Sequence, residues 1–342
     1  MITSHTDPQT QAILKRLDEL AAMRNAPDLA GPVAFYRAAL PLLREAQAGI
    51  EPFTLDAETA QHKLASGLPL LIGEDLPLDP DATRDLFLRL CRIAETVGGP
   101  APATPKSSGW SLPFKKRSQP PIEPIGGNPQ AQRPAPIPSG QVSNGNEAAL
   151  RAAAVGQIRQ AVEQEDLDLS AVWSALAAGE WPRVELTANG LQLDPELLRM
   201  LAQNSLKPAL RAWAQGLQQT VDLDRWKRGQ CPMCGGPPAY SEIQGKEGAR
   251  RLRCTMCGAG WLYPRLQCAF CATKDYKLLG YLSVVGEEEK YRLQTCDACR
   301  GYVKVVVTYD PTPVDLLPVE DLATLHLDLI AAEREFTRAP MG

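Results

Sequence analysis

Apolar residues recur at the three- and four-residue intervals of α-helices through most of the first two thirds of the chain. These series lie within residues 9–97, 146–176 and 194–218 and predict an α-helical unit. In the first two segments they are carried by Ile13, Leu14, Leu17, Leu20, Leu86, Leu90, Ile93, Ala94, Val97, Leu150, Val155, Ile158, Val162, Val172, Trp173 and Leu176.

Three positions carry signals for where these helices begin and break. Asp81 is expected to be the N-cap of the helix that holds Leu86. Asp194 followed by Pro195 is a strong start signal, because Pro suits the first helical position. Pro208 predicts a kink or break within the helix that follows.

The composition changes abruptly at residues 98–140. This segment of 43 residues holds 11 prolines and 6 glycines. Such a composition sustains neither a helix nor a central strand, so the segment is predicted to be a long connector or a partly ordered wrap.

After Trp226 the pattern changes to short segments rich in β-branched and aromatic residues. Strands are predicted over 277–285, 290–295 and 302–309, followed by a helix over 319–336. The fold class is therefore α+β: a helical domain, two small β modules in tandem and a C-terminal helix. The predicted domains are residues 1–225, 226–264, 265–311 and 312–342.

Cysteine is the most informative residue type, because eight of the nine cysteines form four C-x-x-C pairs. No secretory signal precedes them, so a reducing cytoplasm, and metal binding in place of disulfides, is the expectation. The pairs are Cys231/Cys234, Cys254/Cys257, Cys268/Cys271 and Cys296/Cys299. The ninth, Cys91, is interpreted as a small core residue.

Two C-x-x-C turns together complete a tetrahedral shell of four sulfurs around one ion. Sequential pairing gives inserts of 19 and 24 residues, each of which reads as a hairpin. Interleaved pairing remains geometrically possible. Gly235 and Gly258 follow the second cysteine of their pairs, where a positive φ turns N–H groups towards sulfur. The other two pairs lack this glycine, so the two sites are expected to differ in affinity or metal.

Both ions can be structural, since small β-hairpins need added folding free energy. A catalytic zinc is disfavoured because all eight ligands are committed, and a thioredoxin-type dithiol uses only one pair. Four thiolates suit zinc and iron alike, and spacing does not choose between them.

Other functional classes have little support. No nucleotide-binding or serine-hydrolase motif is present, and no apolar run is long enough to span a membrane. Arg250, Arg251, Arg253 and Arg265 flank the cysteines and are interpreted as a solvated face or a protein-docking patch. The net charge of −4 also argues against nucleic acid as the main partner.

The order of these motifs resembles the FdhE family, the bacterial formate dehydrogenase accessory proteins. The resemblance rests on Cys231-Pro-Met-Cys-Gly, Arg253-Cys-Thr-Met-Cys, Trp261, Cys268-Ala-Phe-Cys, Cys296-Asp-Ala-Cys-Arg-Gly-Tyr-Val-Lys and Asp321-Leu-Ala-Thr-Leu-His-Leu-Asp. It is specific over residues 226–336 and weaker over the helices. The segment at 98–140 departs from the family pattern.

The resemblance implies a cytoplasmic maturation factor, not an enzyme, that binds the catalytic subunit of formate dehydrogenase before export. It also implies two rubredoxin-like iron sites, with zinc as the alternative occupant. The implied ligands are Cys231, Cys234, Cys254 and Cys257 for the first site, and Cys268, Cys271, Cys296 and Cys299 for the second. The rival hypotheses are a nucleic-acid-binding zinc ribbon and an electron-transfer protein.

Overall fold

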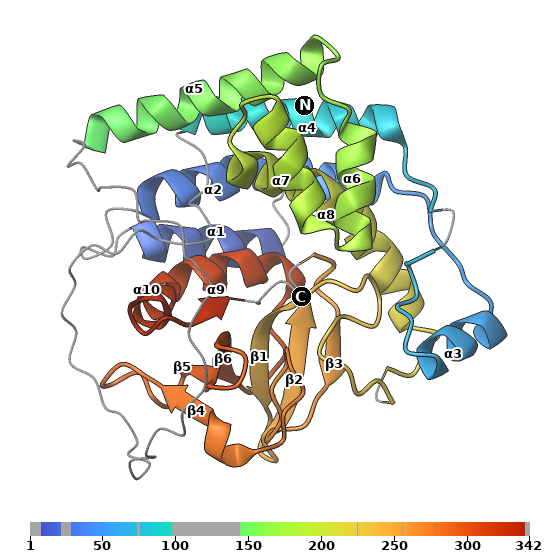
Figure 1. Cartoon of the computed structure of the whole chain (residues 1–342), viewed down its shortest axis with the longest axis vertical. Coiled ribbons are helices and arrows are strands. Elements are labelled where there is room, and N and C mark those ends of the chain that lie inside the picture. The colour runs from blue at the N-terminus through green and yellow to red at the C-terminus, as the bar shows by residue number, and fades with distance from the viewer. Residues whose placement is uncertain are drawn as a thin grey trace, which may run out of the picture.

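The computed structural model describes residues 8–21, 29–73, 76–97, 144–223, 225–254 and 256–338. A helical layer lies above a β-sheet, with the C-terminal helices beside the first helices (Figure 1). The predicted α+β class is confirmed. The predicted Pro-rich connector at 98–140 falls outside the described residues.

The helical layer has one main core. Its helices are α1 (Pro8–Ala21), α2 (Ala30–Ala48), α3 (Ala57–Ala65), α4 (Pro80–Val97), α5 (Asn144–Glu163), α6 (Leu169–Ala178), α7 (Trp181–Gly190) and α8 (Pro195–Gln218). Phe35, Phe87, Leu90, Ile158 and Trp213 are almost wholly buried in this core. Burial of such large side chains is the main favourable term that holds the helices together. Cys91 is buried there as predicted.

Two predictions about the helix ends are corrected. Asp79, not Asp81, caps α4, because its carboxylate accepts the backbone N–H groups of residues 81 and 82 at 3.0 and 2.9 Å. Pro80 takes the first helical position, which moves the cap to the residue before it. Helix α8 is not broken at Pro208, since packing of its buried face outweighs one lost N–H donor, and a kink there stays a prediction. The Asp194 cap is confirmed by a 2.9 Å bond from Leu197 N–H.

One sheet contains all the strands of the described residues. They are β1 (Pro238–Gln244), β2 (Ala249–Cys254), β3 (Gly260–Leu262), β4 (Leu279–Leu282), β5 (Tyr291–Cys296), β6 (Gly301–Thr308) and β7 (Thr337–Arg338). The order is β3-β2-β1-β6-β5-β4, and β7 pairs with β6. β1 and β6 run parallel, with Ser241 opposite Val305. This pairing joins an N-terminal and a C-terminal antiparallel unit into one sheet.

The predicted single helix at 319–336 is two helices, α9 (Leu317–Ala323) and α10 (Leu325–Glu333). The break falls at Thr324, a fully buried residue whose hydroxyl donates to the carbonyl of Glu320 at 2.8 Å. Such a local bond competes with regular helix geometry. Helix α9 packs against α1 and α2 through an apolar cluster that includes Leu17, Val33 and Leu322. None of the described helices is long and apolar enough to cross a membrane.

Candidate metal centres

The structure brings the eight paired cysteines into two groups of four. Within each group the sulfur atoms all lie within 4.8 Å of one another, close enough to hold a metal ion. Site 1 consists of Cys231, Cys234, Cys254 and Cys257, and site 2 of Cys268, Cys271, Cys296 and Cys299. This is the sequential grouping, not the interleaved one. The antiparallel pairs β1–β2 and β4–β5 each bring the second C-x-x-C pair of a site back beside the first.

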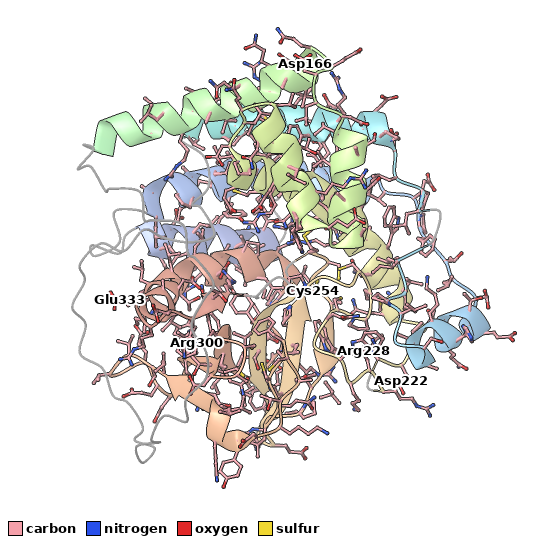
Figure 2. The ribbon with its side chains drawn as sticks, in the orientation of Figure 1. Asp166, Asp222, Arg228, Cys254, Arg300 and Glu333 are labelled. Carbon is pink, nitrogen blue, oxygen red and sulfur yellow. The ribbon has the colours of Figure 1, made fainter. Side chains whose placement is uncertain are left out.

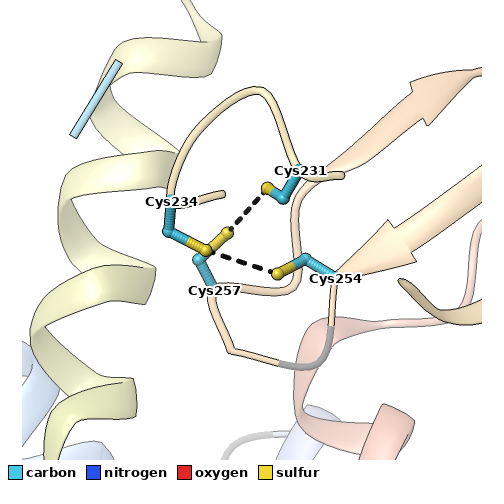
Figure 3. Close-up of side chains that lie close together, drawn as sticks. All are labelled: Cys231, Cys234, Cys254 and Cys257. Carbon is cyan, nitrogen blue, oxygen red and sulfur yellow. Dashed lines mark hydrogen bonds between the residues drawn. The ribbon is translucent and has the colours of Figure 1, made fainter. Parts of the chain in front are cut away.

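The sulfur positions of site 1 suit a tetrahedral ion (Figure 3). Cys231 Sγ lies 3.5 Å from Cys257 Sγ, and Cys234 Sγ lies 3.4 Å from Cys254 Sγ. In a tetrahedron with metal–sulfur bonds of about 2.3 Å, neighbouring sulfurs are about 3.8 Å apart. These two distances lie slightly below that value and all four sulfurs lie within 4.8 Å of one another, so the group can hold a four-coordinate thiophilic ion.

The turns of site 1 direct backbone N–H groups at sulfur. Met233 N–H donates to Cys231 Sγ at 3.4 Å, and Met256 N–H donates to Cys254 Sγ at 3.3 Å. Gly235 and Gly258 have φ of 74° and 73°, which confirms the positive φ expected at these glycines. Donors of this kind stabilise the negative charge of thiolates.

Site 1 lies where the helices meet the sheet, and Figure 2 shows Cys254 at this level. Cys231, Cys254 and Cys257 are at most 2% exposed and belong to the same core as the helices. The segment before α4 contacts the first turn directly. The N–H groups of residues 70 and 71 donate to the carbonyls of residues 232 and 233 at 2.9 and 2.8 Å.

Burial and mutual hydrogen bonding set the thiol pKa values at site 1. Burial raises the pKa of Cys231 and of Cys257 well above the usual range. Burial acts in the same direction on Cys254, but hydrogen bonds from the other three thiols outweigh it and lower the pKa of Cys254 well below that range. A metal ion must displace protons from such thiols, so loading of the site depends on pH.

Helix α8 places cationic side chains near site 1. Burial, and then the charge of Arg211, lower the pKa of Lys207 to about 8, and the charge of Cys254 acts in the opposite direction. Arg211 pairs with Asp315 at 2.9 Å and also interacts electrostatically with Cys254. Four thiolates around a divalent ion carry a net charge of about −2, which nearby cations offset.

Site 2 has similar geometry without the glycines. Cys268 Sγ to Cys299 Sγ and Cys271 Sγ to Cys296 Sγ are each 3.7 Å apart. Ala272 and Arg300, which follow the second cysteine of their pairs, both have φ of 57°. The turn therefore imposes the left-handed conformation on residues that disfavour it. A positive φ at Ala272 and Arg300 was not predicted from the sequence. The signal was their position directly after the second cysteine of a C-x-x-C pair, where the other site has glycine.

The two sites differ in exposure. Cys271 is exposed and Cys299 is half-buried, whereas Cys268 and Cys296 are buried. The apolar cluster around site 2 is small and separate from the main core, and it includes Leu279. Site 2 therefore lies at the surface of the sheet layer.

The predicted solvated or docking face of arginines is corrected for two of its members. Arg250 and Arg253 are 3% and 5% exposed. Arg250 donates to Ser241 Oγ at 2.7 Å and also to the side chain of Gln294 in β5. Arg253 forms an ion pair with Glu242 at 3.0 Å. The order of polar and apolar residues along β2 does not show that other elements cover both faces of this strand, so the burial of Arg250 and Arg253 was not predicted.

Fold and site together define a class of α+β protein whose single sheet carries two four-cysteine groups able to hold metal ions. Residues 230–265 match the family model described as FdhE, central domain, and residues 266–342 match FdhE, C-terminal domain. Residues 230–342 therefore match two consecutive domains of the FdhE family.

The chain is also similar to curated relatives over part of their length and, in fold, to one solved structure. The chain is 34% identical to the FdhE homologue of Aquifex aeolicus over 154 residues, which is 44% of this chain and 52% of that protein. It is 33% identical to the FdhE homologue of Pseudomonas aeruginosa over 163 residues, which is 45% of this chain and 52% of that protein. The chain thus spans about half the length of the curated relatives it matches. The crystal structure of the Pseudomonas aeruginosa FdhE protein has the same fold, with a TM-score of 0.56, 23% identity, and coverage of 96% of this chain and 93% of that one.

Proposed function

We propose that this protein is an accessory protein for formate dehydrogenase and not itself an enzyme. It acts in the cytoplasm, where it binds the catalytic subunit of the dehydrogenase before export. The observation that carries the proposal is the match of residues 230–342 to two consecutive FdhE domains, with a four-cysteine group in each.

We propose iron as the occupant of both sites, with zinc as the alternative. Site 1 and site 2 supply four thiolate sulfurs each, and their sulfur separations suit either ion. Iron in such a shell supplies one-electron redox chemistry, whereas zinc supplies stability alone. In both cases the cysteines hold the hairpins closed, and the N–H groups of the turns stabilise the thiolate charge.

The test is purification of the tagged full chain from its native cells, with identification of bound proteins and measurement of metal content. We expect the dehydrogenase catalytic subunit and two metal ions per chain. Cys231→Ser/Cys234→Ser should lose one ion and weaken capture of the subunit, because an incomplete shell no longer holds the first turn. Cys91→Ala is the matched control, since Cys91 belongs to neither group.

Other outcomes would favour the rival functions. Capture of nucleic acid with steep salt dependence, and of no dehydrogenase, would contradict the proposal and favour a nucleic-acid-binding ribbon. The burial of Arg250 and Arg253 speaks against that rival, because neither side chain is free to contact phosphate. Reversible reduction with no dehydrogenase bound would favour an electron-transfer protein.

A further inference from the structure

We infer that the two sites have different roles: site 1 is a permanent structural joint between the helices and the sheet, and site 2 is an exchangeable site that gains and loses its ion through the exposed face at Cys271. This inference rests on the proposed metal sites. It concerns which ion can leave while the protein stays folded.

The surroundings of site 1 hold its turns from several sides. A Cβ atom on Gly235 would lie 2.6 Å from Ile72 Cδ1, and one on Gly258 would lie 2.3 Å from Val314 Cγ1. The segment before α4 therefore contacts the turn at Gly235, and the segment before α9 contacts the turn at Gly258. Together with the backbone hydrogen bonds from residues 70 and 71, these contacts mean that site 1 opens only if neighbouring elements move away.

Site 2 is held at Cys268 and at the turn that ends with Arg300, whose carbonyl accepts from Thr337 N–H at 2.8 Å, whereas Cys271 lies at the exposed edge. Tyr263 Oη donates to the carbonyl of Cys268 at 2.8 Å, and a Cβ atom on Gly229 would lie 1.6 Å from the carbonyl oxygen of Ala269. Cys271 and Ala272 are exposed, and the turn that contains them is closed by one backbone hydrogen bond, from Cys268 N–H to the carbonyl of Thr273 at 2.9 Å. Loss of this one hydrogen bond would let the segment after Cys271 move outwards while Cys268 stays anchored.

Backbone strain also favours opening of site 2. Both of its turns place a residue other than glycine at φ of 57°, whereas both turns of site 1 use glycine. Opening of either turn releases this strain. Local opening of a small, exposed and strained segment requires less free energy than opening of a core element, so the ion of site 2 should leave by local motion alone.

The experiment follows zinc release from the zinc-loaded full chain in the presence of a colorimetric chelator. We expect two phases of one ion each, with the fast phase faster by about tenfold or more. Cys271→Ser should abolish the fast phase. Cys234→Ser, at the equivalent position of site 1, should abolish the slow phase and lower the melting temperature more.

A second measurement needs no variant at a ligand position. During chelation the chain is alkylated in short pulses and each cysteine is followed by mass spectrometry, in a Cys91→Ala background that removes the ninth thiol. We expect Cys271 and Cys299 to react before Cys231, Cys254 and Cys257. Release of both ions at one rate, or simultaneous alkylation of both sites, would overturn the inference. A chain that binds no zinc at all would instead overturn the proposed metal sites themselves.

Discussion

Ala272 and Arg300 adopt the left-handed backbone that Gly235 and Gly258 adopt at the other site. The closed C-x-x-C turn requires this conformation after its second cysteine, whatever side chain is present. For a residue with a Cβ atom the left-handed conformation costs about 1–2 kcal/mol. The left-handed backbone therefore destabilises the turns of site 2, whereas the glycines of site 1 adopt it without this loss of free energy.

Ala272→Gly should remove part of this cost. We expect the free energy of unfolding to rise by about 1 kcal/mol, and zinc to leave site 2 more slowly, because glycine accepts positive φ freely. Denaturant titration and chelator-driven release measure the two effects. Ala298→Gly, between the two cysteines of the other turn, is the control and should bring no gain. Equal behaviour of the two variants would contradict the argument.

At the scale of elements, Arg250 joins the two antiparallel units of the sheet. It extends from β2, and one guanidinium nitrogen donates to the carbonyls of Pro264 and Gln267 at 2.8 and 2.9 Å, in the segment that leads to site 2. Another nitrogen donates to Gln294 in β5. The guanidinium also lies over the ring of Tyr263. Arg250 thus adds a buried connection between the two units besides the β1–β6 pairing.

Arg250→Ala should lower the free energy of unfolding by about 3 kcal/mol, because it leaves several buried acceptors without a donor. Lys246→Ala, an exposed change in the turn between β1 and β2, should have almost no effect. Chemical denaturation of both variants with zinc bound provides the comparison. If Arg250→Ala unfolded like the wild type, the hydrogen bonds of Arg250 would not be what couples the units.

At the scale of the whole molecule, a partly buried ion-pair network fixes the end of the described chain to its centre. Asp321 in α9 accepts from Lys304 of β6 at 2.7 Å and from Arg338 of β7 at 2.6 Å. Asp328 in α10 accepts from Tyr302 Oη at 2.7 Å and pairs with Lys304. Because α9 also packs on α1 and α2, this network connects the sheet to the helical layer.

The network predicts a loss of stability in acid. Burial raises the pKa of Asp321, but the charges of Arg338 and Lys304 outweigh it and hold that pKa well below the usual range. The ionised carboxylate therefore stabilises the fold at pH values above the unfolded pKa of about 4, and this contribution is lost as the pH falls from there towards the folded pKa.

Asp321→Asn should be less stable than the wild type at pH 7, and the difference should shrink as the pH falls below about 4. Thermal unfolding across this range, with metal content followed in parallel, measures the effect. Asp297→Asn removes an exposed carboxylate from an i,i+3 pair and serves as the control. A difference between Asp321→Asn and the wild type that stayed constant with pH would rule out this role for Asp321.

Local sequence signals were sufficient for much of the fold. The series that includes Leu86 and Leu90 predicted α4, and Asp194 with Pro195 predicted the start of α8, because helical periodicity and capping depend on neighbouring residues only. The break predicted as one alternative at Pro208 and the single helix predicted at the C-terminus were wrong because they depended on more than neighbouring residues. A buried helix tolerates proline, and Thr324 breaks its helix while fully buried, and both effects depend on distant contacts.

For the candidate sites, the sequence by itself determined the residue type and spacing, since two C-x-x-C pairs separated by a hairpin can share one ion without help from the rest of the chain. Only the tertiary structure decided how deeply each site is buried and what surrounds it. It buries site 1 against the helices, leaves Cys271 of site 2 exposed and encloses Arg250 between β2 and β5. The physical reason is that spacing is a property of the local backbone, whereas burial depends on which distant elements pack against it.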